Sequence, residues 1–228
     1  MSRPDSALLF AAGLGLRMRP LTDTVPKPLV EVAGRPLFDH ALDLLRRAGI
    51  GTIVANTHYL ADRMAAHLAR NGVAESREPE LLDTGGGLKA ALPLLRPGPA
   101  ITLNTDAVWT GTNPVETLCH AWDPGVMDGL MVMVPRDAAA GHGGNGDFSM
   151  DAKGRLKPGT DLVYTGLQIL KTGPFRDEIE TFFSMHRVWG QMLADSTLHG
   201  VIHGGGWCDV GRPESIALAE AMLEGARV

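Results

Sequence analysis

Short apolar runs alternate along this chain with longer segments in which apolar residues recur every three or four positions. The short runs are typical of strands buried on both faces, and the longer segments are typical of helices that bury one face. Strands are therefore expected at residues 8–12, 52–56, 100–104, 130–134 and 207–210. Helices are expected at residues 36–48, 60–71, 88–95, 114–121, 185–194 and 213–226.

Prolines, glycines and one asparagine mark the ends of several of these helices. Pro36 suits the first turn of its helix, and Gly49 follows the last turn. Gly72 ends the next helix in the same way. Asn113 before Pro114 is a typical N-cap.

The order of the elements indicates the fold class. Strands that alternate with helices predict an α/β protein whose central sheet is mostly parallel and is covered by helices on both faces. Between residues 147 and 170 the pattern changes to short strands and turns, which predicts a small antiparallel addition. The chain shows no repeat, linker or low-complexity tract, so we expect residues 1–228 to form a single domain.

Composition argues against several classes of protein. Hydrophobic residues make up 44% of the 228 residues, which suits a folded core rather than a disordered chain. A net charge of −5 provides no basic face for nucleic acid, and no apolar segment is long enough to span a membrane. The two cysteines have no metal-binding spacing and suit a reduced compartment. We expect a cytoplasmic protein with no nucleic-acid or membrane partner.

The turn after the first expected strand carries two glycines and an arginine. Gly13 and Gly15 let the backbone approach phosphate oxygens, and Arg17 supplies positive charge within the same turn. Met18 stands where a dinucleotide fingerprint has its third glycine, and no P-loop motif is present. The glycines alone are equally compatible with a tight turn that binds nothing. Arg17 favours the nucleotide interpretation.

Lys27 stands between Pro26 and Pro28, which fix the backbone on both sides and remove two N–H donors. Such a stiff segment leaves its lysine little freedom, so Lys27 is a candidate to balance the charge of a polyphosphate. Taken alone, the segment also describes an exposed lysine in a loop bracketed by prolines.

Two distant aspartates are candidate metal ligands. Asp106 lies just past the carboxyl end of the strand expected at 100–104, where open α/β sheets bind ligands. Asp209 has apolar neighbours in a short strand, which is an unfavourable place for a charge without a partner. One Mg²⁺ ion held by both carboxylates would explain the two positions together. Separately, Asp106 also suits a turn cap, and Asp209 suits a buried salt bridge.

Three glycines, Gly85 to Gly87, precede the helix expected at 88–95. Backbone amides of a glycine turn at the start of a helix can reach a flat base or a phosphate. Glu80, five residues before Gly85, could accept hydrogen bonds from the edge of a base. In isolation Glu80 is more typical of an ordinary exposed glutamate.

Together these segments resemble the signature of the sugar-1-phosphate nucleotidyltransferase family. The resemblance rests first on LFAAGLGLRMRPLT at residues 9–22 and PKPL at 26–29. It continues, in the order typical of the family, through residues 84–87, 104–106, 165–167 and 207–211. It therefore spans nearly the whole chain, and the joint match is far more specific than any one motif.

The resemblance implies a Rossmann-like three-layer sandwich and a Mg²⁺-dependent reaction of a sugar-1-phosphate with a nucleoside triphosphate. It assigns Arg17 and Lys27 to catalysis at the phosphates, and Asp106 and Asp209 to Mg²⁺. The contacts that it implies for the nucleotide are Ala11, Ala12, Gly13, Gly15, Glu80 and Gly85. Those that it implies for the sugar side are Asn104, Asn145, Asp147 and Gly166. No side-chain nucleophile is implied, so we expect direct transfer without a covalent enzyme intermediate.

Two features depart from the pattern of the family. Thr105 precedes Asp106 where many members carry glycine, and this side chain would crowd the site or shift the metal. The segment Tyr164-Thr165-Gly166 lacks the preceding glutamate and the second lysine that many members use for the sugar phosphate. The next lysine is Lys171. The sequence therefore leaves open which cation holds the sugar phosphate.

Within the family, the chain is most similar to the N-acetylmuramate-1-phosphate uridylyltransferases of cell-wall recycling, through its short length and residues 78–87 and 143–148. This similarity implies UTP and N-acetylmuramate-1-phosphate as substrates and a monomer or weak homodimer. A mannose-1-phosphate guanylyltransferase and a glucose-1-phosphate thymidylyltransferase are the close alternatives. A non-catalytic nucleotide-sugar sensor is a further alternative, which Thr105 permits.

Overall fold

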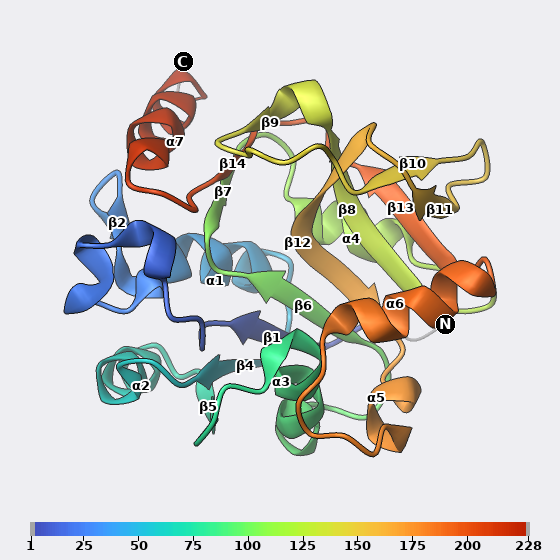
Figure 1. The fold of residues 1–228 in the computed structure, drawn as a ribbon, viewed down its shortest axis with the longest axis horizontal. Helices are drawn as coiled ribbons and strands as arrows, with labels where there is room; N and C mark the ends of the chain where they lie inside the picture. The colour runs from blue at the N-terminus through green and yellow to red at the C-terminus, as the bar shows by residue number, and fades with distance from the viewer. Residues whose placement is uncertain (1–2, 227–228) are drawn as a thin grey trace.

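The computed structural model describes residues 3–226, and its largest sheet contains nine strands (Figure 1). One half of this sheet is parallel, in the order β6 (Ala100–Asn104), β1 (Ser6–Phe10), β4 (Thr52–Thr57) and β5 (Ala74–Arg77). The long strand β12 (Leu162–Leu170) lies antiparallel between β6 and β8 (Gly129–Pro135). β13 (Leu198–Ile202) pairs with β8 in parallel, and the hairpin of β10 (Phe148–Met150) and β11 (Leu156–Pro158) joins β12.

This topology confirms the predicted α/β class, with parallel strands in the central sheet and added antiparallel strands. The antiparallel part reaches the middle of the sheet because β12 runs beside β6 over the register Leu167–Leu103 to Leu170–Ala100. The carboxyl ends of β1, β4, β5 and β6 consequently share one edge. Open α/β sheets bind ligands at this edge.

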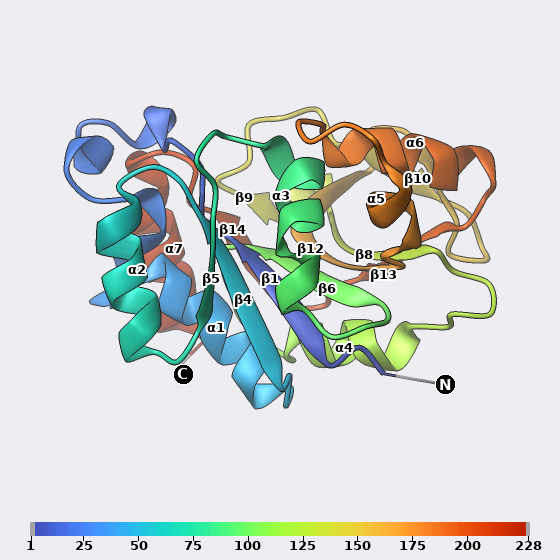
Figure 2. The ribbon, with the colours of Figure 1, turned by 90° about the horizontal axis from the view of Figure 1, so that it is seen from below.

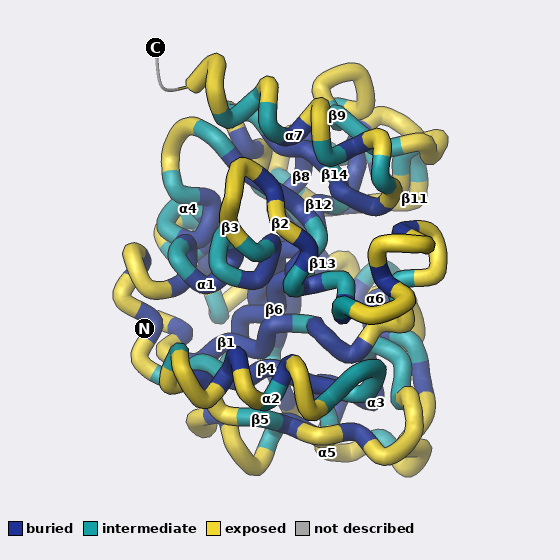
Figure 3. Tube along the Cα trace, turned by 90° about the vertical axis from the view of Figure 1, so that its left-hand side faces the viewer, coloured by how far each residue is buried: buried dark blue, intermediate teal, exposed yellow. Residues whose placement is uncertain are grey.

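Helices cover the two faces of the sheet, and alternate residues of β1 show how (Figures 1 and 2). Ala7 and Leu9 pack in one cluster with α1 (Leu37–Arg47), α2 (Ala61–Arg70) and α4 (Pro114–Ala121). Leu8 packs in the opposite cluster with α3 (Asp83–Ala91), α5 (Gly173–Asp177) and α6 (Met185–Ala194). Figure 3 shows the buried strands between the helices, whose outer faces are exposed. None of the helices described is long and apolar enough to cross a membrane.

A small second sheet lies beside the large one and carries the last helix. It consists of β7 (Ala107–Trp109), β14 (Trp207–Asp209) and β9 (Ala139–Ala140), and α7 (Glu214–Gly225) packs against β14. A short hairpin joins β2 (Glu31–Val32) to β3 (Arg35–Pro36). Single 3₁₀ turns are found at Leu16–Met18, Leu21–Asp23, Lys27–Leu29, Leu92–Leu94 and Arg136–Ala138.

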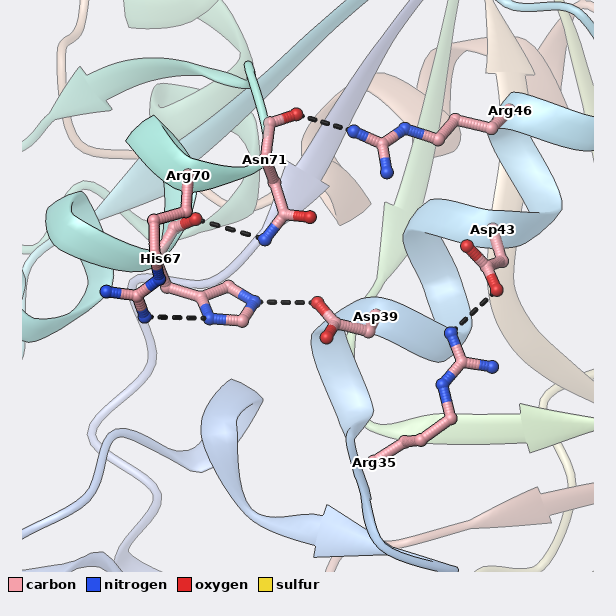
Figure 4. A network of polar contacts seen from close by, with 7 residues as sticks. All are labelled: Arg35, Asp39, Asp43, Arg46, His67, Arg70 and Asn71. Atoms are coloured by element: carbon pink, nitrogen blue, oxygen red, sulfur yellow. Dashed lines mark hydrogen bonds and ion pairs between the residues drawn. The ribbon is translucent and has the colours of Figure 1, made fainter.

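A polar network fastens α2 to α1 on the outside of the parallel half (Figure 4). The Nε2 atom of His67 lies 2.6 Å from Oδ1 of Asp39. Toward the other end of α1, Arg46 donates to the carbonyl oxygen of Asn71, the residue after α2, at 2.5 Å. The two contacts join α1 to α2, which packs against β4 and β5.

Most predicted elements are found where the sequence places them. The helices at 36–48, 60–71, 114–121, 185–194 and 213–226 match α1, α2, α4, α6 and α7 to within one residue at either end. Asn113 caps α4 as expected, because its Oδ1 accepts from the N–H of Val115 at 3.0 Å. The first strand ends at Phe10, two residues earlier than predicted. Sequence patterning missed β5, an edge strand in which only Ser76 is buried, and therefore no apolar run marks it.

The prediction that Gly85 to Gly87 form a turn before a helix at residue 88 is wrong. Helix α3 begins at Asp83, so Gly85 to Gly87 lie inside it, and the helix gives way to a 3₁₀ turn after Ala91. Packing explains the glycines, since a Cβ on Gly86 would lie 2.1 Å from the carbonyl oxygen of Thr181. A Cβ on Gly85 would lie 2.4 Å from the ring of Phe183. The glycines let α3 approach the segment before α6 closely.

We predict that Gly85→Ala lowers the free energy of unfolding by about 1–3 kcal/mol, because the new methyl group overlaps Phe183. Gly190→Ala is the matched control in α6, where a Cβ would meet nothing within 4 Å. It should raise the free energy of unfolding by about 0.4–1 kcal/mol, because alanine restricts the unfolded chain. Urea unfolding of both variants tests the pair, and an unchanged stability of Gly85→Ala would contradict the packing role.

Candidate active site

The loop after β1 folds back onto the lysine that the sequence singled out. Gly15 has a φ of 63°, and its carbonyl oxygen accepts a hydrogen bond from Thr22 Oγ1 at 2.8 Å. A Cβ on Gly15 would lie 3.1 Å from the Cβ of Lys27. Only a residue without a Cβ suits this approach. The loop thereby lines a cavity of about 400 Å³ together with Lys27 and Asp106.

Lys27 forms an ion pair with the first candidate metal ligand. Its Nζ lies 2.8 Å from Oδ2 of Asp106, and the two side chains are 14% and 30% exposed. Asp106 lies two residues past the end of β6, as predicted. Thr105 does not turn its hydroxyl toward the aspartate, because Thr105 Oγ1 donates to the carbonyl oxygen of Phe10 at 2.7 Å. The departure from the family pattern therefore ties the ends of β6 and β1 together.

Strand pairing brings the second aspartate beside the first. In the antiparallel pair of β7 and β14, Asp209 stands opposite Ala107, the residue after Asp106. The N–H of Val210 donates to the carbonyl oxygen of Asp106 at 2.7 Å. A Cβ on Gly211 would lie 3.1 Å from both Nη2 of Arg17 and Oδ2 of Asp209. Arg17 and the two aspartates therefore converge although they are far apart in the sequence.

The electrostatics of Asp209 reflect this convergence. Burial raises the pKa of Asp209, and the negative charge of Asp106 raises it further. The charges of Lys27 and Arg17 lower it, with a contribution from His142. The ligand-free site thus holds two carboxylates that repel each other, and a divalent cation between them would relieve that repulsion.

The donor set suits Mg²⁺. This ion is bound in proteins by one or two carboxylates, with water and substrate phosphates completing its octahedral shell. Between residues 3 and 226 no group of three or more His, Cys, Asp or Glu side chains forms a metal site. A cation at Asp106 and Asp209 would therefore need further ligands from water or a bound substrate.

A second cavity, of about 350 Å³, opens at the carboxyl ends of the parallel strands. Its lining includes the predicted residues Ala11, Ala12 and Gly13 on one side. Lys27 and Asp106 line it on another side, so it is continuous with the ion pair. Leu81 and Phe182, both partly exposed, add apolar surface. The apolar surface of this cavity suits a flat base, and its charged surface suits a phosphate chain.

Two buried polar residues that the sequence analysis missed shape this cavity. Asn56 and Glu78 are each 3% exposed and lie at the ends of β4 and β5. Oδ1 of Asn56 accepts from the N–H of Ala11 at 2.7 Å, and its Nδ2 donates to Oε1 of Glu78 at 2.7 Å. Oε2 of Glu78 accepts from the N–H of Leu82 at 3.1 Å. The chain of hydrogen bonds fixes three neighbouring loops, and burial raises the pKa of Glu78.

The structure places two of the predicted nucleotide contacts outside the lining of this cavity. Glu80 is exposed and is not among the residues that line this cavity, whereas Glu78 is. The two glutamates lie in an irregular segment, where the alternation of a strand does not tell which side chain faces inward. Gly85 is buried within α3, and its neighbours Asp83 and Thr84 line the cavity instead. The position of Gly85 is explained by packing against Phe183.

The predicted sugar-side residues are only partly brought together. Asn104 lines the cavity, and Gly166 makes room for it, since a Cβ on Gly166 would lie 2.7 Å from the Asn104 side chain. Gly166 has a φ of 86° and lies at the irregularity of β12. Asp147 and Asn145 are both exposed and do not line the cavity. Oδ2 of Asp147 accepts from the N–H of Tyr164 at 2.8 Å, which gives Asp147 a structural contact.

Lys171 is at the wrong edge of the sheet to hold a sugar phosphate. The preceding residue, Leu170, pairs with Ala100 at the start of β6, and the site lies past the end of that strand. Nζ of Lys171 is 2.7 Å from Oδ1 of Asp128.

Comparisons with known proteins show the family to which the chain belongs. Residues 7–144 match the model of the MobA-like NTP transferase domain. The chain belongs to the MobA-like NTP transferase family. It is 40% identical to the N-acetylmuramate alpha-1-phosphate uridylyltransferase of Caulobacter vibrioides, over 96% of this chain and 97% of that protein. It is 33% identical to the enzyme of the same name from Neisseria meningitidis serogroup B, over 95% and 97%.

A solved structure shows the same fold at low identity. HddC from Yersinia pseudotuberculosis, complexed with GMP-PN, has a TM-score of 0.77 and 22% identity, over 96% of this chain and 99% of that one. The predicted membership of the sugar-phosphate nucleotidyltransferases is confirmed by the relatives. In this NTP transferase, the glycine loop at residues 13–17, Lys27 and Asp106 line the same cavity.

We predict that Asp209→Asn raises the melting temperature of the ligand-free protein, because it removes a charge that burial disfavours and that the Asp106 carboxylate repels. The native state binds the Asp209 proton more tightly than the unfolded chain does, since its pKa is raised. The contribution of Asp209 to stability therefore falls as the pH rises from the ordinary value of 3.8 through the raised pKa. Asp209→Asn should lose this part of the pH dependence.

Asp128→Asn is the control of opposite sign. Burial raises the pKa of Asp128, but the hydrogen bonds from Lys171 and Thr197 and the charge of Lys171 outweigh it and hold the pKa below its ordinary value. The carboxylate therefore stabilises the native state above the ordinary pKa. This variant should melt at a lower temperature at neutral pH. Thermal melts from pH 4 to 8 provide the measurement, and a destabilised Asp209→Asn would show that the carboxylates do not repel each other.

Proposed function

We propose that this chain is an N-acetylmuramate-1-phosphate uridylyltransferase that forms UDP-N-acetylmuramate and pyrophosphate from the sugar phosphate and UTP, in the cytoplasmic recycling of cell-wall sugars. The convergence of Arg17, Lys27, Asp106 and Asp209 on one space supports the proposal most directly. The identity of 40% to an enzyme of this name supports the choice of substrates.

The reaction needs positioning and charge neutralisation more than covalent chemistry. An oxygen of the sugar phosphate forms a bond to the α-phosphorus of UTP, and the bond from that phosphorus to the bridging oxygen breaks as pyrophosphate leaves. Both reactants are anions, so their repulsion has to be offset. Arg17 and Lys27 provide positive charge beside the glycine loop, and the preorganised backbone of residues 11–15 lines the phosphate path.

Lys27 has two successive partners in this account. In the ligand-free protein its ammonium group is bound to Asp106 at 2.8 Å. A triphosphate competes for the same ammonium group, and Asp106 is then available to a cation. Mg²⁺ bound by Asp106 and Asp209 would supply electrophilic stabilisation of the phosphates. The exchange couples substrate binding to completion of the site.

A non-catalytic sensor is less well supported by the geometry. Thr105 was the feature that permitted it, and the Thr105 hydroxyl is bound to Phe10 rather than directed at Asp106. The proximity of both basic residues to both carboxylates supports transfer instead.

The substrates are tested by pyrophosphate release over a grid of UTP, GTP and dTTP with N-acetylmuramate-1-phosphate, mannose-1-phosphate and glucose-1-phosphate. We expect UTP with N-acetylmuramate-1-phosphate to give the highest kcat/KM, and EDTA to abolish turnover until Mg²⁺ is restored. A higher kcat/KM with GTP and mannose-1-phosphate, or with dTTP and glucose-1-phosphate, would replace the proposal by that alternative. Binding of UTP without pyrophosphate release from any pair would favour the sensor.

We predict that Lys27→Ala and Asp106→Ala each lower kcat by roughly 10²–10³-fold, the usual effect of removing one preorganised charge contact. Lys171→Ala is the matched control, because its ammonium group also binds an aspartate, at 2.7 Å, but at the opposite edge of the sheet. Steady-state pyrophosphate release should leave Lys171→Ala within twofold of the unmodified protein, as roughly expected for a remote exposed pair. Equal turnover of Lys27→Ala and Lys171→Ala would reject the role of Lys27.

A further inference from the structure

A third cavity, of about 220 Å³, adjoins the nucleotide cavity on the side of the antiparallel strands. The two cavities share Phe10, Asp83, Thr84 and Asn104 in their linings. Its remaining lining comes from β12 and from the first turns of α6, which are not part of the nucleotide cavity. A substrate joined to the α-phosphate would extend from one cavity into the other.

The far wall of this cavity is held rigid by buried hydrogen bonds. Nε1 of Trp189 donates to Oε1 of Gln168 at 3.0 Å, and Nε2 of Gln168 donates to Oγ1 of Thr102 at 3.0 Å. All three side chains are at most 6% exposed. The ring of Tyr164 packs edge-on against Trp189 with centroids 5.1 Å apart. An aromatic wall fixed in this way suits the apolar face of a sugar ring.

His186 carries the one basic side chain among the residues that line this cavity. Its ring packs edge-on against Trp189, with centroids 4.7 Å apart, so the rigid wall also positions the imidazole. The acidic side chain in the lining, Asp83, already accepts a hydrogen bond from the N–H of Thr84. The lining therefore offers an anionic group one basic partner, and that partner stands at the exposed mouth of the cavity.

The neighbouring cations are engaged elsewhere. Arg187, the next residue along α6, forms ion pairs with Glu178 and Glu180 at 3.2 and 3.1 Å. Lys89 donates to the carbonyl oxygens of the same two glutamates. Lys27 serves the phosphates under the proposed function. A second anionic group on the sugar side consequently has His186 as its available basic partner.

We infer that His186 determines specificity by donating a hydrogen bond from its imidazole to the carboxylate of a sugar that carries a lactyl ether. The inference rests on the proposed function, because N-acetylmuramate-1-phosphate has this carboxylate whereas N-acetylglucosamine-1-phosphate lacks it. A hydrogen bond to a charged group contributes more than one between neutral groups, so the carboxylate is a strong basis for discrimination.

The test compares the two sugar phosphates in His186→Ala. We expect kcat/KM for N-acetylmuramate-1-phosphate to fall about 10- to 100-fold, in line with loss of one charge-assisted hydrogen bond. The inhibition constant of N-acetylglucosamine-1-phosphate as a competing ligand, and the KM for UTP, should stay within twofold. His186→Gln retains an N–H donor and should recover part of the loss. Arg187→Ala is the matched control on the same turn, and it should change none of these values.

The outcomes separate this inference from the proposed function. Turnover of N-acetylmuramate-1-phosphate by His186→Ala at the unmodified rate overturns the role of His186 and leaves the proposed function standing. An equal weakening of both sugar phosphates also overturns it, because it would show a general effect on the cavity wall. If the unmodified protein does not turn over N-acetylmuramate-1-phosphate with UTP, the proposed function fails, and the assignment of His186 fails with it.

Discussion

The pairing of β7 with β14 is the constraint on which the candidate active site depends. β7 continues the chain directly from Asp106, and β14 ends at Asp209, so their antiparallel register places two carboxylates together that no local pattern connects. The bond from the N–H of Val210 to the carbonyl oxygen of Asp106 locks the register at this point. Burial and the neighbouring Asp106 carboxylate both raise the pKa of Asp209 and so disfavour its charged form, although Lys27 and Arg17 offset part of this effect. The fold retains this unfavourable pair, and a divalent cation with a polyphosphate is the ligand combination that would make it favourable.

A network of buried hydrogen bonds supports the site from the parallel half of the sheet. Asn56 and Glu78 connect the loops after β1, β4 and β5 by buried hydrogen bonds, so the backbone that faces the nucleotide cavity is fixed before any ligand binds. On the antiparallel half, Gln168 does the same for the aromatic wall around Trp189. The charged groups thus lie between two rigid polar networks. Preorganisation of this kind is what charge-based catalysis of phosphoryl transfer requires, since groups that are already oriented need no rearrangement during the reaction.

The sequence predicts those features of the architecture that depend on the residue pattern of a single strand or helix. The sequence predicts the places of Asn104 and Asp106 because β6 is a short run of buried residues that ends at Asn104, two residues before Asp106. Tertiary contacts decide the remaining features. The inward-facing glutamate is Glu78 rather than Glu80, because the path of an irregular segment depends on Asn56 and Leu82. The three glycines lie inside α3, although glycine usually disfavours helices, because Thr181 and Phe183 occupy the space of their side chains. Residues that cooperate across strands, such as Gln168 and Trp189, leave no periodic signal in one stretch of chain.

The central claim is that Asp106 and Asp209 hold one divalent cation against the triphosphate. The most direct measurement is a crystal structure with a non-hydrolysable UTP analogue and Mn²⁺, in which anomalous scattering locates the metal. The account predicts one anomalous peak within about 2.2 Å of a carboxylate oxygen from each aspartate and of a phosphate oxygen, as roughly expected for octahedral coordination of a small divalent cation. A peak that touches neither aspartate, or a triphosphate bound away from the loop at residues 13–17, would contradict it.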